Sequence, residues 1–148
     1  MLSQTTEYAL RAMVHLAALD PDCAVNSGTI AKRTKIPHGY LSKILRDLVV
    51  GELIRSQRGP SGGFSLARPA QQISLLDVIS AVDPIARIKK CPLGNPAHLK
   101  LCPLHSRLDR AIALIEQEFG RTTLAELLTT QAADKGECRS LQRIKDPH

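Results

Sequence analysis

Residues 36–68 have the sequence IPHGYLSKILRDLVVGELIRSQRGPSGGFSLAR, and the residue pattern of this segment is the main evidence for the fold class. Its first half predicts a helix that begins at Pro37, since a helix tolerates proline in its first turn, where the missing N–H would have no helical partner. Gly51 is a natural end for this helix. Apolar side chains recur between these two residues at the spacing of one buried helical face, as Leu41, Ile44, Leu45, Leu48 and Val49.

The other side of this predicted helix is polar and carries basic residues. A helix that buries one face and exposes a polar N-terminal side can enter the major groove of duplex DNA. Tyr40, Ser42 and Lys43 would then reach base edges or phosphates, with His38 at the leading end. The full polar face consists of His38, Tyr40, Ser42, Lys43, Arg46 and Asp47.

The second half of the stretch predicts a β-hairpin. Residues 53–56 and 64–67 form two short apolar segments, and the glycine-rich residues 58–63 lie between them. Glycine lets a backbone approach another molecule closely, and an arginine at such a tip suits a narrow minor groove. Taken alone, Arg58 could equally be a solvated turn residue, but the basic helix before it favours DNA contact.

The residues before this stretch complete a helix-turn-helix. Residues 4–19 have the apolar periodicity of an amphipathic helix that Ser3 or Thr5 can cap. A short helix is predicted to follow Asn26-Ser27 and to end near Lys35. Helix, short helix, tight turn, helix and hairpin is the order of a winged helix-turn-helix. We therefore expect a mainly α fold with a small β-wing, and a DNA-binding domain over residues 1–83. The candidate DNA-binding residues are His38, Tyr40, Ser42, Lys43, Arg46, Arg58, Gly62 and Gly63.

The charge distribution agrees with a polyanionic partner. The chain of 148 residues has a formal net charge of +6, and residues 30–68 hold eight basic and two acidic residues, which accounts for all of it. Such a segment suits duplex DNA, although charge alone would also fit a solvated basic face. Two Tyr, two Phe and no Trp disfavour stacking on single strands. With no signal-like start and no membrane-length apolar run, we expect a cytoplasmic protein.

The second half of the chain changes character after residue 83. Ser74 and Asp77 predict a capping box at the start of a helix that ends at Asp83–Pro84. Residues 84–105 are expected to form a loop that contains Cys91 and Cys102, because prolines replace any periodicity there. A longer helix is expected from Ser106, with a short helix after it up to residue 128, and residues 129–148 are expected to be a disordered tail. The apolar residues of the longer helix are Leu108, Ala111, Ile112, Ile115 and Phe119.

Three segments resemble the Rrf-type family of bacterial winged-helix transcription regulators. They are MLSQTTEYALRAMVHLAAL (residues 1–19), the stretch 36–68 already quoted, and CPLH (residues 102–105). The resemblance implies a homodimer in which the helix from Ser106 packs against its partner, and a pseudo-palindromic DNA operator with one half-site per subunit. Periodicity alone leaves the apolar face of that helix open between a dimer interface and an intramolecular core.

The same resemblance implies an iron–sulfur cluster in residues 84–105. Members of the family hold a [2Fe–2S] or [4Fe–4S] cluster on three cysteines, and Cys91 and Cys102 match the first and third of these. The middle position falls near His98, where this sequence has no cysteine. The resemblance gives His105 as the third ligand and Glu7 of the partner subunit as the fourth, with His98 as a competitor. The missing cysteine favours [2Fe–2S], and such a centre would make the regulator a sensor of redox state, nitric oxide or iron–sulfur status.

The residues themselves leave other interpretations open. Two cysteines eleven residues apart could form a reversible disulfide, a zinc site or nothing functional. A regulator of the same fold without a cofactor, controlled by a protein partner or by a thiol or zinc switch, is therefore the alternative function. Cys23 is expected to be a small core or surface residue, and Cys138 has no evident partner. No catalytic motif is present, so we do not expect an enzyme.

Overall fold

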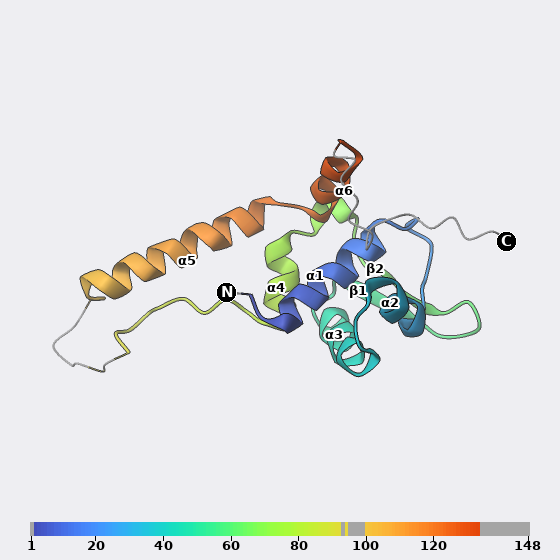
Figure 1. Cartoon of the computed structure of the whole chain (residues 1–148), viewed down its shortest axis with the longest axis horizontal. Coiled ribbons are helices and arrows are strands. Elements are labelled where there is room, and N and C mark those ends of the chain that lie inside the picture. Colours follow the sequence, from blue (N-terminus) through green and yellow to red (C-terminus); the bar gives the residue numbers. More distant parts are fainter. Residues whose placement is uncertain (1, 93, 95–99, 134–148) are drawn as a thin grey trace.

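The computed structural model describes residues 2–92, 94 and 100–133 of the chain. Within them six α-helices, one 3₁₀ turn and a two-stranded sheet follow one another. Figure 1 shows a body made of most of these elements and one long helix, α5, that extends away from it. None of the described helices has the length and apolarity that crossing a membrane requires.

The helix-turn-helix is formed by α2 (Ser27–Thr34) and α3 (His38–Val50), and α1 (Gln4–Ala17) packs against both. Ser3 and Asn26 cap α1 and α2 through their side-chain oxygens, as serine and asparagine do at helix starts. Lys35 takes a left-handed backbone conformation, with φ 55°, and ends α2. Pro37 lies at the N-cap of α3, so the first helical residue is His38, one position later than the sequence predicts.

The wing consists of β1 (Ile54–Gln57) and β2 (Gly63–Leu66), paired antiparallel with Ile54 opposite Leu66 and Gln57 opposite Gly63. Both strands lie one residue away from their expected positions. Phe64 also exchanges two backbone hydrogen bonds with Val25 in the segment between α1 and α2. This isolated bridge fixes the start of β2 to the segment between α1 and α2.

The core lies where α1, α3, α4 (Leu75–Val82) and the start of α6 (Leu124–Ala133) meet. The capping box expected at Ser74 and Asp77 is present at the start of α4. A 3₁₀ turn, η1 (Ala70–Gln72), precedes it and was not expected. The fully buried side chains include Met13, Ile30, Leu41, Leu45, Leu48, Val78 and Leu124.

The C-terminal half differs from expectation in two ways. The long helix α5 (Pro103–Arg121) begins three residues earlier than Ser106, because Pro103 occupies its first position and Cys102 its N-cap. The last helix, α6, continues to Ala133 and packs against α1 and η1, so residues 129–133 are helical rather than part of a disordered tail. Leu124 anchors α6, since its side chain is buried and its N–H donates to the carbonyl of Ile73. The rest of the expected tail lies outside the described residues.

Helix α5 is the one long element that the body does not enclose. Among the described helices and strands it packs chiefly against α4, and none of its residues is buried. After α4, residues 83–92 run alongside α5 from the body towards the N-terminal end of that helix (Figure 1). Helix α5 then leads the chain in the opposite direction, towards the body. This arrangement brings the two cysteines of the expected loop to one end of the molecule.

Candidate DNA-binding surface and metal centre

The polar face of α3 is open to solvent. His38, Tyr40, Ser42, Lys43 and Arg46 are all exposed, while Leu41, Ile44, Leu45 and Leu48 on the other face are buried. Lys43 and Arg46 have no ion-pair partner within the part of the chain that the structure describes. Two cations without ion-pair partners on one exposed helical face can attract a phosphate backbone.

Two side chains of the α3 N-terminus are held by neighbours. The His38 imidazole Nε2 lies 3.3 Å from Ser27 Oγ at the start of α2, which joins the two helices of the motif. The Ser42 hydroxyl donates to the His38 carbonyl at 3.1 Å, so it is engaged within its own helix. Both residues stay exposed, and of the predicted contact residues on α3 only these two have such polar restraints.

Tyr40 is supported by α1, a contact that sequence reasoning missed. Its ring meets Tyr8 edge to face at a centroid distance of 6.3 Å, and the Arg11 guanidinium lies 5.5 Å from the centre of the Tyr8 ring. Arg11 also donates to the carbonyl of Thr34 at 3.2 Å and pairs with Glu7. The periodicity of residues 4–19 gives no signal for these contacts, because they depend on how α1 crosses the helix-turn-helix.

The wing tip presents Arg58 to solvent, beside Gly59 with its φ of 108°. The two other tip glycines are required by the chain itself. A Cβ at Gly62 would lie 2.4 Å from the Gln57 carbonyl oxygen, and one at Gly63 would lie 2.3 Å from the carbonyl carbon of Val25. Their lack of a side chain therefore has an internal cause, whatever they contact in a complex.

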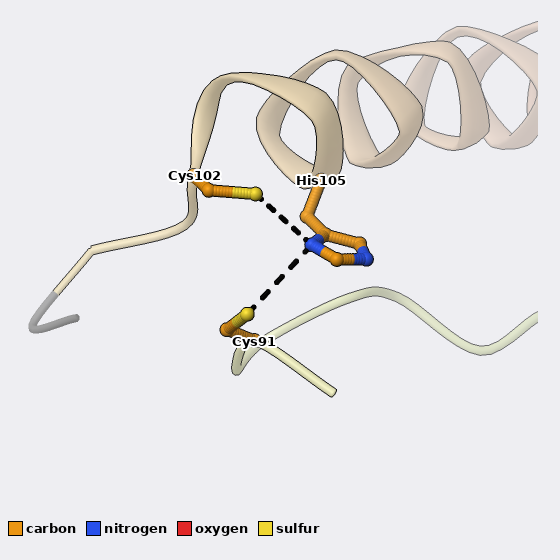
Figure 2. A group of neighbouring side chains, drawn as sticks. All are labelled: Cys91, Cys102 and His105. Atoms are coloured by element: carbon orange, nitrogen blue, oxygen red, sulfur yellow. Dashed lines mark hydrogen bonds between the residues drawn. The ribbon is translucent and has the colours of Figure 1, made fainter. Parts of the chain in front are cut away.

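Cys91, Cys102 and His105 converge at the N-terminus of α5. Figure 2 shows both sulfur atoms directed at the Nδ1 atom of His105, which lies 3.1 Å from Cys102 Sγ and 3.8 Å from Cys91 Sγ. All three ligand atoms lie within 4.8 Å of one another, and the three residues are half-buried. Two sulfurs and one imidazole nitrogen at this spacing are a donor set for a thiophilic metal or an iron–sulfur cluster.

The local sequence explains two of the three residues of this triad. Cys102 is the N-cap of α5 and His105 is its third helical residue, so a spacing of three places both side chains over the same first turn. Cys91 comes from a different segment and reaches the same place from the side (Figure 2). The structure thus brings Cys91, Cys102 and His105 together, and their role as metal ligands stays a prediction.

The remaining candidate ligands are not in this group. Glu7 is exposed on α1 and pairs with Arg11, four residues along the same helix, so within one chain it is not part of the triad. Cys23 is exposed between α1 and α2. His98 and Cys138 lie outside the described residues.

Comparison with known proteins assigns this chain to one class of protein. The Rrf2 family model, described as an iron-dependent transcriptional regulator, matches residues 2–130. A Mycobacterium tuberculosis protein named as a candidate HTH-type transcriptional regulator is 40% identical over 128 residues, which cover 85% of this chain and 80% of the relative. A similarly named Aquifex aeolicus protein is 31% identical over 140 residues, with 88% of this chain and 93% of the relative covered.

Solved structures share the fold. IscR from T. potens has a TM-score of 0.75 at 24% identity and covers 93% of this chain and 90% of its own. CymR, described as the global cysteine regulator of B. subtilis, has a TM-score of 0.73 at 23% identity and covers 88% and 97%. The winged-helix architecture is therefore that of known regulators, and the match over nearly the whole chain shows that this protein is a member of the Rrf2 family of transcriptional regulators.

Proposed function

We propose that this protein is a homodimeric, sequence-specific DNA-binding regulator that senses redox state, nitric oxide or iron–sulfur status through a [2Fe–2S] cluster. The observation that carries the sensing part is the convergence of Cys91, Cys102 and His105 at the start of α5. The iron-dependent description of the matching family supports iron as the metal. Because its target is chromosomal DNA, the proposed location is the cytoplasm.

The proposed DNA contact uses α3 and the wing. The exposed side of α3 enters the major groove, where Lys43 and Arg46 neutralise phosphates and Tyr40 meets base edges. Arg58 at the wing tip reaches the adjacent minor groove. Two such units related by a two-fold axis would match a pseudo-palindromic operator with one half-site per subunit.

The triad fits the ligand requirement of a cluster except for one position. A [2Fe–2S] centre takes four protein ligands, and imidazole can replace thiolate on one iron. Cys91, Cys102 and His105 would supply three, and Glu7 of the partner subunit is the proposed fourth, with His98 as a competitor. A bound cluster would supply redox chemistry at this position. Cys91 would attach the segment after α4 to the cluster and Cys102 would attach α5, so an oxidant that destroys the cluster would break the connection between them.

A zinc or thiol switch is the second candidate, and the spacing of the triad favours it. Usual zinc–ligand bonds are about 2.3 Å to sulfur and about 2.1 Å to nitrogen, which places two ligands of one tetrahedral ion about 3.6 Å apart. The observed sulfur-to-nitrogen distances of 3.1 and 3.8 Å lie on either side of this value. The same three donors would then hold a single ion, and its loss would free two neighbouring thiols for oxidation.

Anaerobic purification followed by iron, sulfide and zinc analysis separates the candidates. About two iron and two sulfide per chain, with visible absorbance that Cys91→Ala or Cys102→Ala abolishes, is the expected result. Cys23→Ala is the matched control, because Cys23 is an exposed cysteine that does not belong to the triad. Stoichiometric zinc without iron would contradict the cluster and support the zinc or thiol switch. If the protein holds neither metal and both cysteine variants bind DNA as wild type does, the remaining hypothesis is a cofactor-free regulator controlled by a protein partner.

A further inference from the structure

Arg87 joins the segment that carries Cys91 to the helix that carries the other two ligands. Its Nε and Nη2 atoms donate to the two carboxylate oxygens of Asp109 on α5, at 2.8 and 2.7 Å. Its Nη1 atom donates to Glu116, two turns further along α5, at 3.1 Å. This forked arrangement uses three nitrogens of one guanidinium and fixes its plane relative to the helix.

The next residue adds a backbone bond to the same carboxylate. The N–H of Ile88 donates to Asp109 Oδ1 at 2.9 Å, so two consecutive residues of the loop are bound to one side chain. The Asp109 carboxylate stays ionised far below neutral pH, because the hydrogen bonds from Arg87 lower its pKa to about 2. We call Arg87, Asp109, Glu116 and the Ile88 N–H the clamp.

The clamp lies close to the ligands along the helix. Asp109 is four residues after His105 and seven after Cys102, a spacing that keeps all three on one face of α5. Four residues correspond to about 6 Å along the helix axis. On the loop side, Cys91 is three residues after Ile88 and cannot move far while Ile88 is bound.

Few other described backbone hydrogen bonds hold this segment. From Pro84 to Pro92 the backbone N–H of Ile88 is the one described amide that binds another element, and the next described bond, from the Gly94 N–H to the Cys91 carbonyl, is local. Without the clamp, the nearest anchor before Cys91 is Asp83 at the end of α4. A tether of eight residues in place of three spreads Cys91 over a larger volume, since the ends of a longer flexible segment meet less often.

We propose that Arg87 and Asp109 are positioning residues that hold Cys91 against Cys102 and His105, so that the three metal ligands are assembled before a metal arrives. This inference rests on the proposed function and adds how the site is built. Isolated surface ion pairs contribute little to stability, so the effect of the clamp is expected on the site rather than on the fold.

The first test measures metal affinity on the full-length, reduced, metal-free protein. Cobalt(II) is the probe, because thiolate coordination gives it visible absorbance. Arg87→Ala and Asp109→Asn are expected to weaken cobalt binding about 10- to 100-fold, the usual range for residues that orient ligands. Lys89→Ala is the matched control. It also removes an exposed cation from this segment, but Lys89 has no described hydrogen-bond or ion-pair partner. Arg87→Lys keeps the charge but loses the fork, and is expected to behave like Arg87→Ala.

The second test needs no metal. With oxidised glutathione, one thiolate attacks the glutathione disulfide and releases one glutathione, and the second cysteine then displaces the other glutathione to form the Cys91–Cys102 disulfide. The second step depends on how often the two sulfurs meet. In Arg87→Ala the mixed disulfide is expected to accumulate and closure to slow at least about threefold relative to wild type and Lys89→Ala, as peptide mass spectrometry would record.

The outcomes separate this inference from the proposed function. If wild type binds neither cobalt nor iron, the proposed sensing function is wrong, and the disulfide rate still tests the clamp. If Arg87→Ala and Asp109→Asn match wild type in both cobalt affinity and closure rate, the clamp is overturned. Unchanged helical circular dichroism in the variants shows that the fold is intact, and if Arg87→Ala is unfolded, Asp109→Asn decides.

Discussion

Lys43 is a residue whose charge should matter for binding to any duplex, whatever its sequence. It lies on the exposed side of α3 with no ion-pair partner among the described residues, so its charge is available to a phosphate. Lys43→Ala should weaken binding to all duplex sequences and reduce the slope of log affinity against log salt by about one. Fluorescence anisotropy over a salt series measures this, with Lys89→Ala as a control of equal charge.

Arg58 should behave differently from Lys43. An arginine in a minor groove reads groove width, so Arg58→Ala should weaken binding mainly to duplexes that are A·T-rich beneath the wing. Equal affinity of Arg58→Ala and wild type for A·T-rich and G·C-rich duplexes would contradict the placement of the wing.

His15, near the end of α1, should make stability depend on pH. Burial, with a further contribution from the charge of Arg33, lowers the pKa of His15 below its usual value of 6.5. The unfolded chain therefore takes up a proton at a higher pH than the folded chain, so stability is full above about pH 6.5 and falls as the pH drops below it. In His15→Gln this part of the decline should vanish. Urea unfolding at pH 7.5 and 5.5 measures it, and an unchanged difference between these two pH values would refute the assignment.

At the scale of single residues, local interactions could be predicted and distant ones could not. The capping box at Ser74 follows from the residue types and their spacing of three, and Ser3 is one of the two caps expected for α1. The pairing of Arg87 with Asp109 joins positions 22 residues apart, and no local pattern marks either residue. The contact of Tyr8 with Tyr40 was missed for the same reason.

At the scale of elements, periodicity gave α1, α3 and the wing to within about two residues, because each has a clear buried face. The start of α5 was placed too late, since Cys102-Pro103 was assigned to the loop although proline is favoured in a first turn. The length of α6 was underestimated, because its polar end has no apolar repeat and is helical as a continuation of a segment anchored by Leu124.

The wing depends on one glycine, Gly63, at the start of β2. A Cβ at Gly63 would lie 2.3–2.7 Å from backbone atoms of Val25 and Asn26, which cannot move without breaking the bridge to Phe64, and the φ of 150° is unfavourable for alanine. Gly63→Ala should therefore destabilise the protein by about 1–3 kcal/mol. Gly39→Ala is the matched control, because a Cβ added at Gly39 would have no atom within 4 Å. Alanine within a helix should raise the free energy of unfolding by about 0.5–1 kcal/mol relative to glycine. Urea unfolding compares them, and equal stabilities would contradict the close approach.

At the scale of the whole molecule, the chain leaves an apolar surface on α5. Leu104, Leu108 and Leu114 are 63%, 47% and 61% exposed, on a helix with no buried residue. The sequence could not separate a core helix from an interface helix, since both have the same apolar repeat. The structure distinguishes two sets of apolar residues on this helix. One set is half-buried on a helix that packs against α4 and consists of Ile112, Ile115 and Phe119, as in a core helix. The three leucines are not covered by any described part of the chain, as in an interface helix.

The last prediction tests whether a second copy covers α5, as the proposed homodimer requires. A charge within an apolar interface loses hydration without gaining a partner, so Leu108→Glu should convert the dimer into monomers in sedimentation analysis at micromolar concentration. Val50→Glu is the matched control: it places the same charge on an apolar residue that is 77% exposed, at the end of α3 and away from α5. Because one half-site binds far more weakly than two joined ones, Leu108→Glu should also lose most of its operator affinity while keeping its fold. If Leu108→Glu sediments as wild type does, the leucines of α5 do not form the interface, and the two half-sites must be joined by another surface.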